Sequence, residues 1–118
     1  MHGGREVKTT GDGFLATFDS PTQGMRCAIA IRDAVRGLGL ELRAGIHTGE
    51  CEVSAGDVAG VAVHVAARLE SAARPGQILV SNTVRELAAG SGVRLADHGR
   101  RELKGLDGTW AVFAVADE

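Results

Sequence analysis

The chain has 118 residues, of which 44% are hydrophobic and 24% charged, values typical of one soluble globular domain. A formal net charge of −2 argues against a strongly basic surface for nucleic acid or anionic lipid. Three phenylalanines, one tryptophan and no tyrosine are too few rings for a base-stacking platform, and no apolar run approaches the roughly 20 residues of a membrane span.

The two cysteines, Cys27 and Cys51, lie far apart and lack the spacing of a metal site. We therefore expect free thiols in a reducing compartment. No signal peptide precedes the first predicted strand, so we expect a cytoplasmic protein.

The first patterned stretch is "VKTTGDGFLATF", Val7–Phe18. Two alternating runs, Glu6–Thr10 and Phe14–Phe18, flank a Gly-Asp-Gly turn, which predicts a β-hairpin. Asp12 at the tip has two interpretations of about equal weight. Aspartate is a common turn residue, but flanking glycines also allow a substrate or metal to approach its carboxylate.

A helix is predicted to begin at "SPTQ", with Ser20 as the N-cap, Pro21 in the first turn and Gln23 closing a capping box. Four apolar residues at helical spacing are expected to pack on a sheet. They are Ala28, Ile31, Val35 and Leu38. Gly37 and Gly39 are expected to end the helix.

Strands are predicted over Leu40–Glu50 and near Cys51–Val53. His47 in "GIHTGE" could be a metal ligand, but a single histidine at a strand end is more often structural. The glycines of that motif favour close backbone packing instead.

The next helix is predicted over Gly60–Ala73, with Val61, Val65 and Leu69 facing the core. His64 and Arg68 are four residues apart and share the opposite face. The ordinary interpretation is a solvated polar face. The alternative is a phosphate site, since a guanidinium offers a fork of donors.

The remaining pattern predicts a buried strand over Gln77–Ser81, a helix ending at Gly90 and a C-terminal hairpin turning at Leu106–Gly108. Lys104 near that turn could simply protect a sheet edge. This element order predicts an α+β or ferredoxin-like sandwich rather than a doubly wound sheet.

Together, four motifs in order resemble the class III nucleotidyl cyclase catalytic domain. They are "VKTTGDGFLATF", "LRAGIHTGE", "GDVAGVAVHVAARLESAARPGQILVS" and "GRRELKG" followed by "TWAVFAV". The resemblance covers Arg5 to Val115 and is similar to bacterial, especially actinobacterial, members. It implies a ferredoxin-like βαββαβ sandwich.

The resemblance implies a role for each matched residue. Asp12 matches one of two aspartates that bind paired divalent ions, Mg²⁺ or Mn²⁺. Lys8 and Asp57 match the pair that recognises adenine. Arg68 matches the catalytic arginine that stabilises charge on the α-phosphate.

Two further positions follow from the same resemblance. Lys104 matches a lysine that binds the triphosphate. His64 stands where the family often has an asparagine that orients the ribose, so this catalytic position departs from the family pattern.

The implied activity is an adenylate cyclase that converts ATP to 3′,5′-cyclic AMP at the interface of a homodimer or of a heterodimer with another cyclase domain. The family domain begins earlier, with a first strand and helices that we do not find before the hairpin. We therefore expect residues 1–118 to form a single partial domain. The alternative is a catalytically incomplete nucleotide-binding or dimerisation module that regulates a partner chain.

Overall fold

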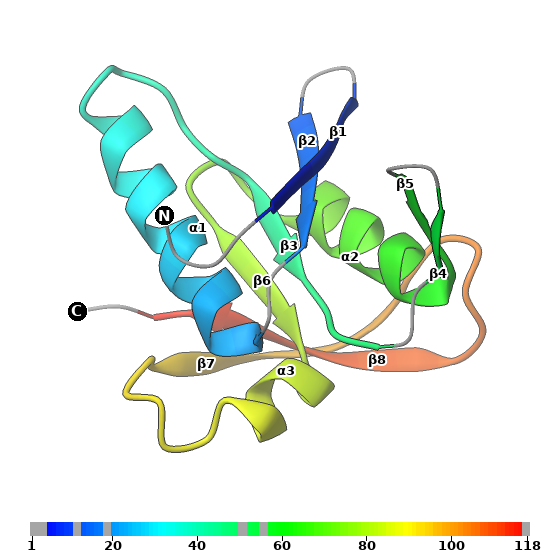
Figure 1. The fold of residues 1–118 in the computed structure, drawn as a ribbon. Helices are drawn as coiled ribbons and strands as arrows, with labels where there is room; N and C mark the ends of the chain where they lie inside the picture. Colours follow the sequence, from blue (N-terminus) through cyan, green and yellow to red (C-terminus); the bar gives the residue numbers. More distant parts are fainter. Residues whose placement is uncertain (1–4, 11–12, 18–19, 50–51, 55–56, 117–118) are drawn as a thin grey trace.

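The computed structural model describes residues 5–10, 13–17, 20–49, 52–54 and 57–116, and side chains within 20–49 and 60–116 (Figure 1). The described residues form eight strands and three helices: β1 Arg5–Thr10, β2 Gly13–Thr17, α1 Pro21–Arg36, β3 Ala44–Ile46, β4 Glu52–Ser54, β5 Asp57–Ala59, α2 Val61–Ala72, β6 Ile78–Ser81, α3 Asn82–Leu87, β7 Leu95–Glu102 and β8 Thr109–Val115. Among the described residues, no helix has the length and apolar character that crossing a membrane requires.

Four strands form the central sheet in the order β3-β6-β8-β7. β3 pairs with β6 in parallel, whereas β6 pairs with β8 and β8 with β7 antiparallel. The parallel pair needs a long connection, which β4, β5 and α2 supply. The mixed sheet with its helices confirms the predicted α+β class.

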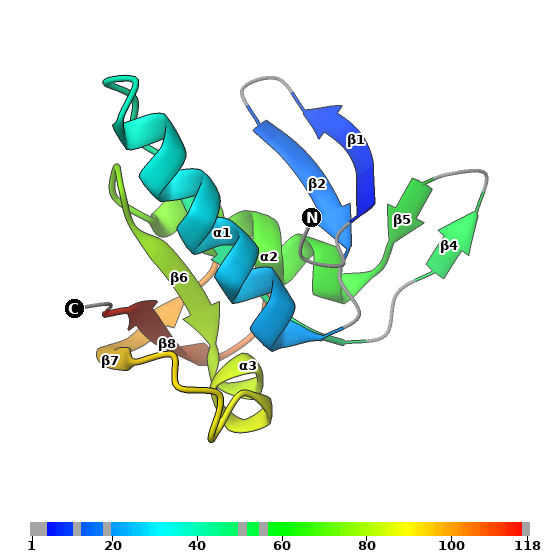
Figure 2. The same ribbon diagram turned by 60° about the vertical axis from the view of Figure 1, so that its left-hand side comes forward.

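Helices pack on both faces of this sheet (Figure 2). Successive residues of β6 point to opposite faces. Accordingly, Leu79 belongs to a core cluster with Val65 and Leu69 of α2, whereas Ile78 and Val80 belong to a second cluster with residues of α1 and α3. All four residues of β6 are buried, as the sequence predicts.

The start of α1 is predicted correctly, but its buried face only in part. The Ser20 hydroxyl accepts a hydrogen bond from the Gln23 backbone N–H at 3.2 Å. The predicted return bond of the capping box, from the Gln23 side chain to the helix start, is wrong. Gln23 Oε1 is buried without a hydrogen-bond partner in the described part of the chain. Met25 and Ala28 are buried, whereas Leu38 is 77% exposed, since it lies beyond the end of the helix.

The predicted strand over Leu40–Glu50 shortens to Ala44–Ile46 because its first residues bond elsewhere. The Leu40 N–H donates to the Val35 carbonyl and so completes the end of α1. The Leu42 carbonyl accepts from Gly76 in the turn before β6. Pairing with β6 therefore begins only at Ala44.

Helix α2 follows prediction over most of its length. Val65 and Leu69 are buried, but Val61 is 65% exposed, so its predicted core position is wrong. Val61 is the first residue of the helix and lines an open hollow instead of facing the sheet. The strand just before it, β5, was not anticipated.

Two small hairpins lie outside the central sheet. β1 pairs with β2 antiparallel, with an irregularity between Glu6 and Lys8, and β4 pairs with β5. β1 also lies against β5, so the two hairpins are neighbours (Figure 2). The first hairpin confirms the prediction made from "VKTTGDGFLATF".

Helix α2 lies very close to the backbone of the sheet at Gly45 of β3. A Cβ atom there would lie 2.3 Å from the Ala66 carbonyl oxygen and 2.3 Å from the Glu70 backbone nitrogen of α2. Real Cβ atoms do not come so near to backbone atoms. The predicted close packing at this glycine is therefore confirmed.

We expect Gly45→Ala to lower the free energy of unfolding by roughly 1–3 kcal/mol, because α2 must move off the sheet to admit the methyl group. Urea denaturation measures this change. The matched control is Gly37→Ala, since Gly37 has φ −64° and its Cβ would have no neighbour nearer than 3.4 Å. This control should change stability by less than about 1 kcal/mol. Equal effects in the two variants would contradict the packing argument.

Candidate functional site

Helix α2 carries two of the predicted site residues, His64 and Arg68. Their spacing of four places one above the other on the helix surface. The Arg68 Nε lies 3.5 Å from the His64 Nε2, and both side chains are partly buried. The next face of the helix, about 100° around its axis, holds Val65 and Leu69 against the sheet.

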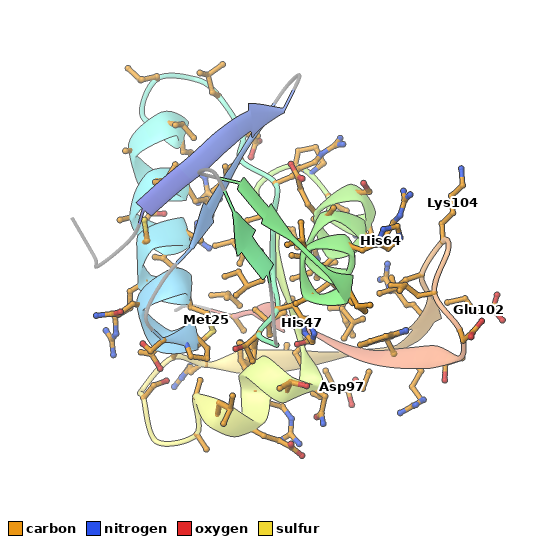
Figure 3. All side chains as sticks on the ribbon, turned by 45° about the vertical axis from the view of Figure 1, so that its right-hand side comes forward. Met25, His47, His64, Asp97, Glu102 and Lys104 are labelled. Atoms are coloured by element: carbon orange, nitrogen blue, oxygen red, sulfur yellow. The ribbon has the colours of Figure 1, made fainter. Side chains whose placement is uncertain are left out.

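The turn between β7 and β8 brings Lys104 to the same place. The Lys104 carbonyl oxygen lies 3.2 Å from the His64 Nε2. Leu103 is buried in the α2 cluster and Leu106 packs against it, so both leucines anchor the turn. Lys104 itself is exposed, and Figure 3 shows its side chain projecting away from the protein beside His64.

An open hollow of about 410 Å³ separates the start of α2 from this turn. It is lined by Gly60, Val61, His64, Gly105 and Leu106. The N-cap of α2 is Gly60, which makes no side-chain capping bond. The unmet N–H groups of a helix N-terminus carry partial positive charge, which favours an anion nearby.

The elements that border the hollow carry two cations, Arg68 on α2 and Lys104 on the turn, and the turn region also carries Glu102 and Asp107. Within the described residues, no carboxylate forms an ion pair with Arg68 or Lys104. Two cations without a neutralising partner can both bind one polyanion, and the guanidinium can contact two oxygens of a phosphate at once. The arrangement is suited to a phosphorylated ligand.

The structure also locates the backbone of the predicted base-reading residues. Lys8 lies in β1 opposite Leu15, and Asp57 is the first residue of β5 opposite Ser54. The strands that carry them lie against each other. Their side chains and the whole of Asp12 lie outside what the structure describes.

A separate polar cluster surrounds His47 at the end of β3. Its Nδ1 lies 2.7 Å from the Ser81 Oγ, and its ring meets the Trp110 ring edge-on at 5.9 Å between centroids. Burial lowers the pKa of His47 from its ordinary value of 6.5. Ser81 also caps α3 by accepting from the Val84 N–H at 3.4 Å. These contacts support a structural role for His47.

The sequence interpretation missed the contacts that shape both clusters. It placed Ser81 correctly in a strand but missed its second role as an N-cap, which a serine just before a helical run signals. It did not anticipate that Gly105, with φ +82°, would place the turn on His64. No local pattern indicates that contact, because His64 and Lys104 are 40 residues apart.

Comparison with known proteins identifies the family. Residues 1–116 match the family described as the adenylate and guanylate cyclase catalytic domain. The chain belongs to this class III cyclase family. The putative adenylate cyclase 3 of Rhizobium meliloti (strain 1021) is 34% identical to this cyclase domain in an alignment 116 residues long. The alignment covers 91% of the chain and 20% of that protein.

Solved cyclase structures have the same fold. An adenylate/guanylate cyclase/hydrolase from Silicibacter pomeroyi has a TM-score of 0.88 at 34% identity, covering 99% of this chain and 75% of that one. The adenylyl cyclase CyaB from P. aeruginosa has a TM-score of 0.76 at 25% identity, with 99% and 74% covered. The cyclase domain thus spans about a fifth of the rhizobial relative and three quarters of the first solved chain.

The lowered pKa of His47 predicts a pH dependence of stability. As pH falls below 6.5, the unfolded chain binds a proton at His47 before the folded chain does, so acid lowers the free energy of unfolding. In His47→Asn, the amide of the asparagine takes the place of the Nδ1 atom but does not titrate. We expect the stability difference between wild type and this variant to shrink in urea titrations from about pH 7.5 to about pH 5.5. A constant difference would contradict the prediction.

Proposed function

We propose that the chain is an adenylate cyclase domain that converts ATP to 3′,5′-cyclic AMP and pyrophosphate. The observation that carries the proposal is that His64 contacts both Arg68 and the Lys104 turn in a cyclase fold, beside the hollow at the start of α2. Lys104 would bind the triphosphate, and Arg68 would stabilise the charge that develops on the α-phosphate.

The reaction is an intramolecular phosphoryl transfer. The ribose 3′-oxygen forms a bond to the α-phosphorus, the bond from that phosphorus to the bridging oxygen of pyrophosphate breaks, and the hydroxyl proton is released to solvent. Negative charge grows on the α-phosphate oxygens and on the leaving group. Arg68 lies on α2 and Lys104 on the turn between β7 and β8, so the two cations would contact different regions of the nucleotide.

Adenine would be selected by Lys8 and Asp57. A lysine donates to a ring nitrogen, whereas an aspartate accepts from the exocyclic amine, and adenine presents both groups together. The neighbouring positions of β1 and β5 support this pair, because a planar base must be contacted by both residues at once.

Two divalent cations, Mg²⁺ or Mn²⁺, are the expected cofactors. Within the described residues, no group of three or more His, Cys, Asp and Glu side chains could hold a metal ion. Asp12 would contribute one carboxylate, and a magnesium site is ordinarily completed by substrate phosphates and water. When bound, the cations lower the pKa of the 3′-hydroxyl and neutralise phosphate charge.

The site would be shared between two cyclase domains, either two copies of this chain or this chain and a different partner. We propose that residues 1–118 act as one catalytic domain in the cytoplasm. Asp12 and Lys8 of one protomer would then serve two different active sites. An isolated protomer would complete neither site.

Incubation with ATP and Mn²⁺, with cyclic AMP quantified by mass spectrometry, tests the proposal. We expect Arg68→Ala to lower turnover by about 10²- to 10³-fold, the usual loss when a preorganised donor is removed. Arg74→Ala is the matched control, because Arg74 is an exposed arginine beyond the end of α2. Equal turnover in the wild type and Arg68→Ala would contradict the assigned role.

The choice of purine is tested by changing Lys8 and Asp57 to Glu and Cys together. Because this change removes the donor and acceptor matched to adenine, we expect turnover of ATP to fall more than turnover of GTP. The ratio of kcat/KM for the two nucleotides measures the effect. An unchanged ratio would remove both residues from base recognition.

The second candidate is a catalytically incomplete module that binds nucleotide or mediates dimerisation and so regulates a partner chain. It is favoured by one observation, that Asp12 is the single residue of this chain matched to a metal-binding carboxylate. Metal-dependent ATP binding without product from ATP or GTP would select this function over catalysis.

A further inference from the structure

The Nε2 atom of His64 faces two groups that make opposite demands on it. The Lys104 carbonyl, at 3.2 Å, can only accept a hydrogen bond, whereas the Arg68 Nε, at 3.5 Å, can only donate one. One ring nitrogen carries a hydrogen or a lone pair in the ring plane, but not both. The two contacts therefore cannot both be hydrogen bonds at the same time.

Distance favours the carbonyl. The 3.2 Å separation from the carbonyl oxygen is at the upper end of the usual range for N–H···O bonds, whereas the 3.5 Å separation from the Arg68 Nε is long for any N–H donor. We infer that His64 is a positioning residue whose Nε2–H holds the Lys104 turn against α2 and leaves Arg68 free to bind substrate. The inference rests on the proposed function for its catalytic meaning, but not for the contact itself.

The shape of the turn agrees with this assignment. Gly105 has φ +82°, and a Cβ atom on it would lie 3.1 Å from the His64 Nε2. A side chain at that position would crowd the ring and strain the backbone. Because Gly105 has no side chain, the main chain after Lys104 can lie against the His64 imidazole.

The assignment also separates His64 from the ribose. If Nε2 binds the turn, only Nδ1 is left to contact a sugar hydroxyl. The amide nitrogen of an asparagine at this position corresponds to Nδ1. The asparagine side chain is too short to reach the Lys104 carbonyl. A glutamine has an amide nitrogen that corresponds to Nε2 and reaches that carbonyl. The two amides therefore distinguish positioning of the turn from orientation of the ribose.

Hydrogen exchange of the full chain without nucleotide tests the contact. The reporter is the Leu106 N–H, which donates to the Leu103 carbonyl at 3.0 Å inside the turn. We expect His64→Ala to speed its exchange about fivefold, the factor that one net hydrogen bond contributes. His64→Gln should restore slow exchange and His64→Asn should not.

The matched control is Ser71→Ala, an exposed change on the same helix, which should leave exchange at Leu106 unchanged. Amides of the buried strand β6 report whether each variant keeps its fold. Unchanged exchange in His64→Ala, or rescue by asparagine as good as rescue by glutamine, would overturn the inference.

A double-mutant cycle on ATP binding with Mn²⁺ links the contact to Lys104. We expect His64→Ala to weaken ATP binding about fivefold when Lys104 is present. In the Lys104→Met background the loss should be less than about twofold, because the histidine acts through the position of that lysine. An equal loss in both backgrounds would overturn the positioning role. If the wild type binds no ATP, the proposed function fails, whereas the exchange experiment still decides the contact.

Discussion

The contact of α2 with β3 at Gly45 is the constraint on which the site depends. Helix backbone lies so close to strand backbone that glycine alone fits between them. This contact sets the depth of α2 on the sheet, and Val65 and Leu69 then fix its rotation by entering the core. The position of His64 and Arg68 is therefore set by the packing of a neighbouring face of the same helix.

That placement explains how a site arises from elements distant in sequence. The C-terminal turn has its own apolar anchors, Leu103 and Leu106, in the cluster that α2 completes. The same burial that stabilises the domain thus brings the Lys104 main chain to His64. The half-buried Arg68 and the exposed Lys104 lie beside the contact without carboxylate partners in the described chain, which leaves both available to an anion.

Much of this arrangement was predictable from local pattern, because hairpin turns, helix caps and buried strands are encoded by neighbouring residues. Ser20 caps its helix as expected. Leu38 and Val61 were misplaced because periodicity says which residues share a face but not where the helix itself begins and ends. The contact of His64 with Lys104 could not be predicted from local pattern, because the two residues are 40 residues apart. The expectation that both residues belong to one site came from the resemblance to cyclases.

The described strands fall into three hydrogen-bonded ladders, and the proposed contacts to substrate are divided among them. Lys8 and Asp57 sit on the two small hairpins, whereas Arg68 and Lys104 belong to α2 and the end of the central sheet. On the proposed assignment, the part that reads the purine and the part that handles phosphate share no strand pairing. Evolution could then retune nucleotide preference in one module while the chemistry in the other is inherited unaltered.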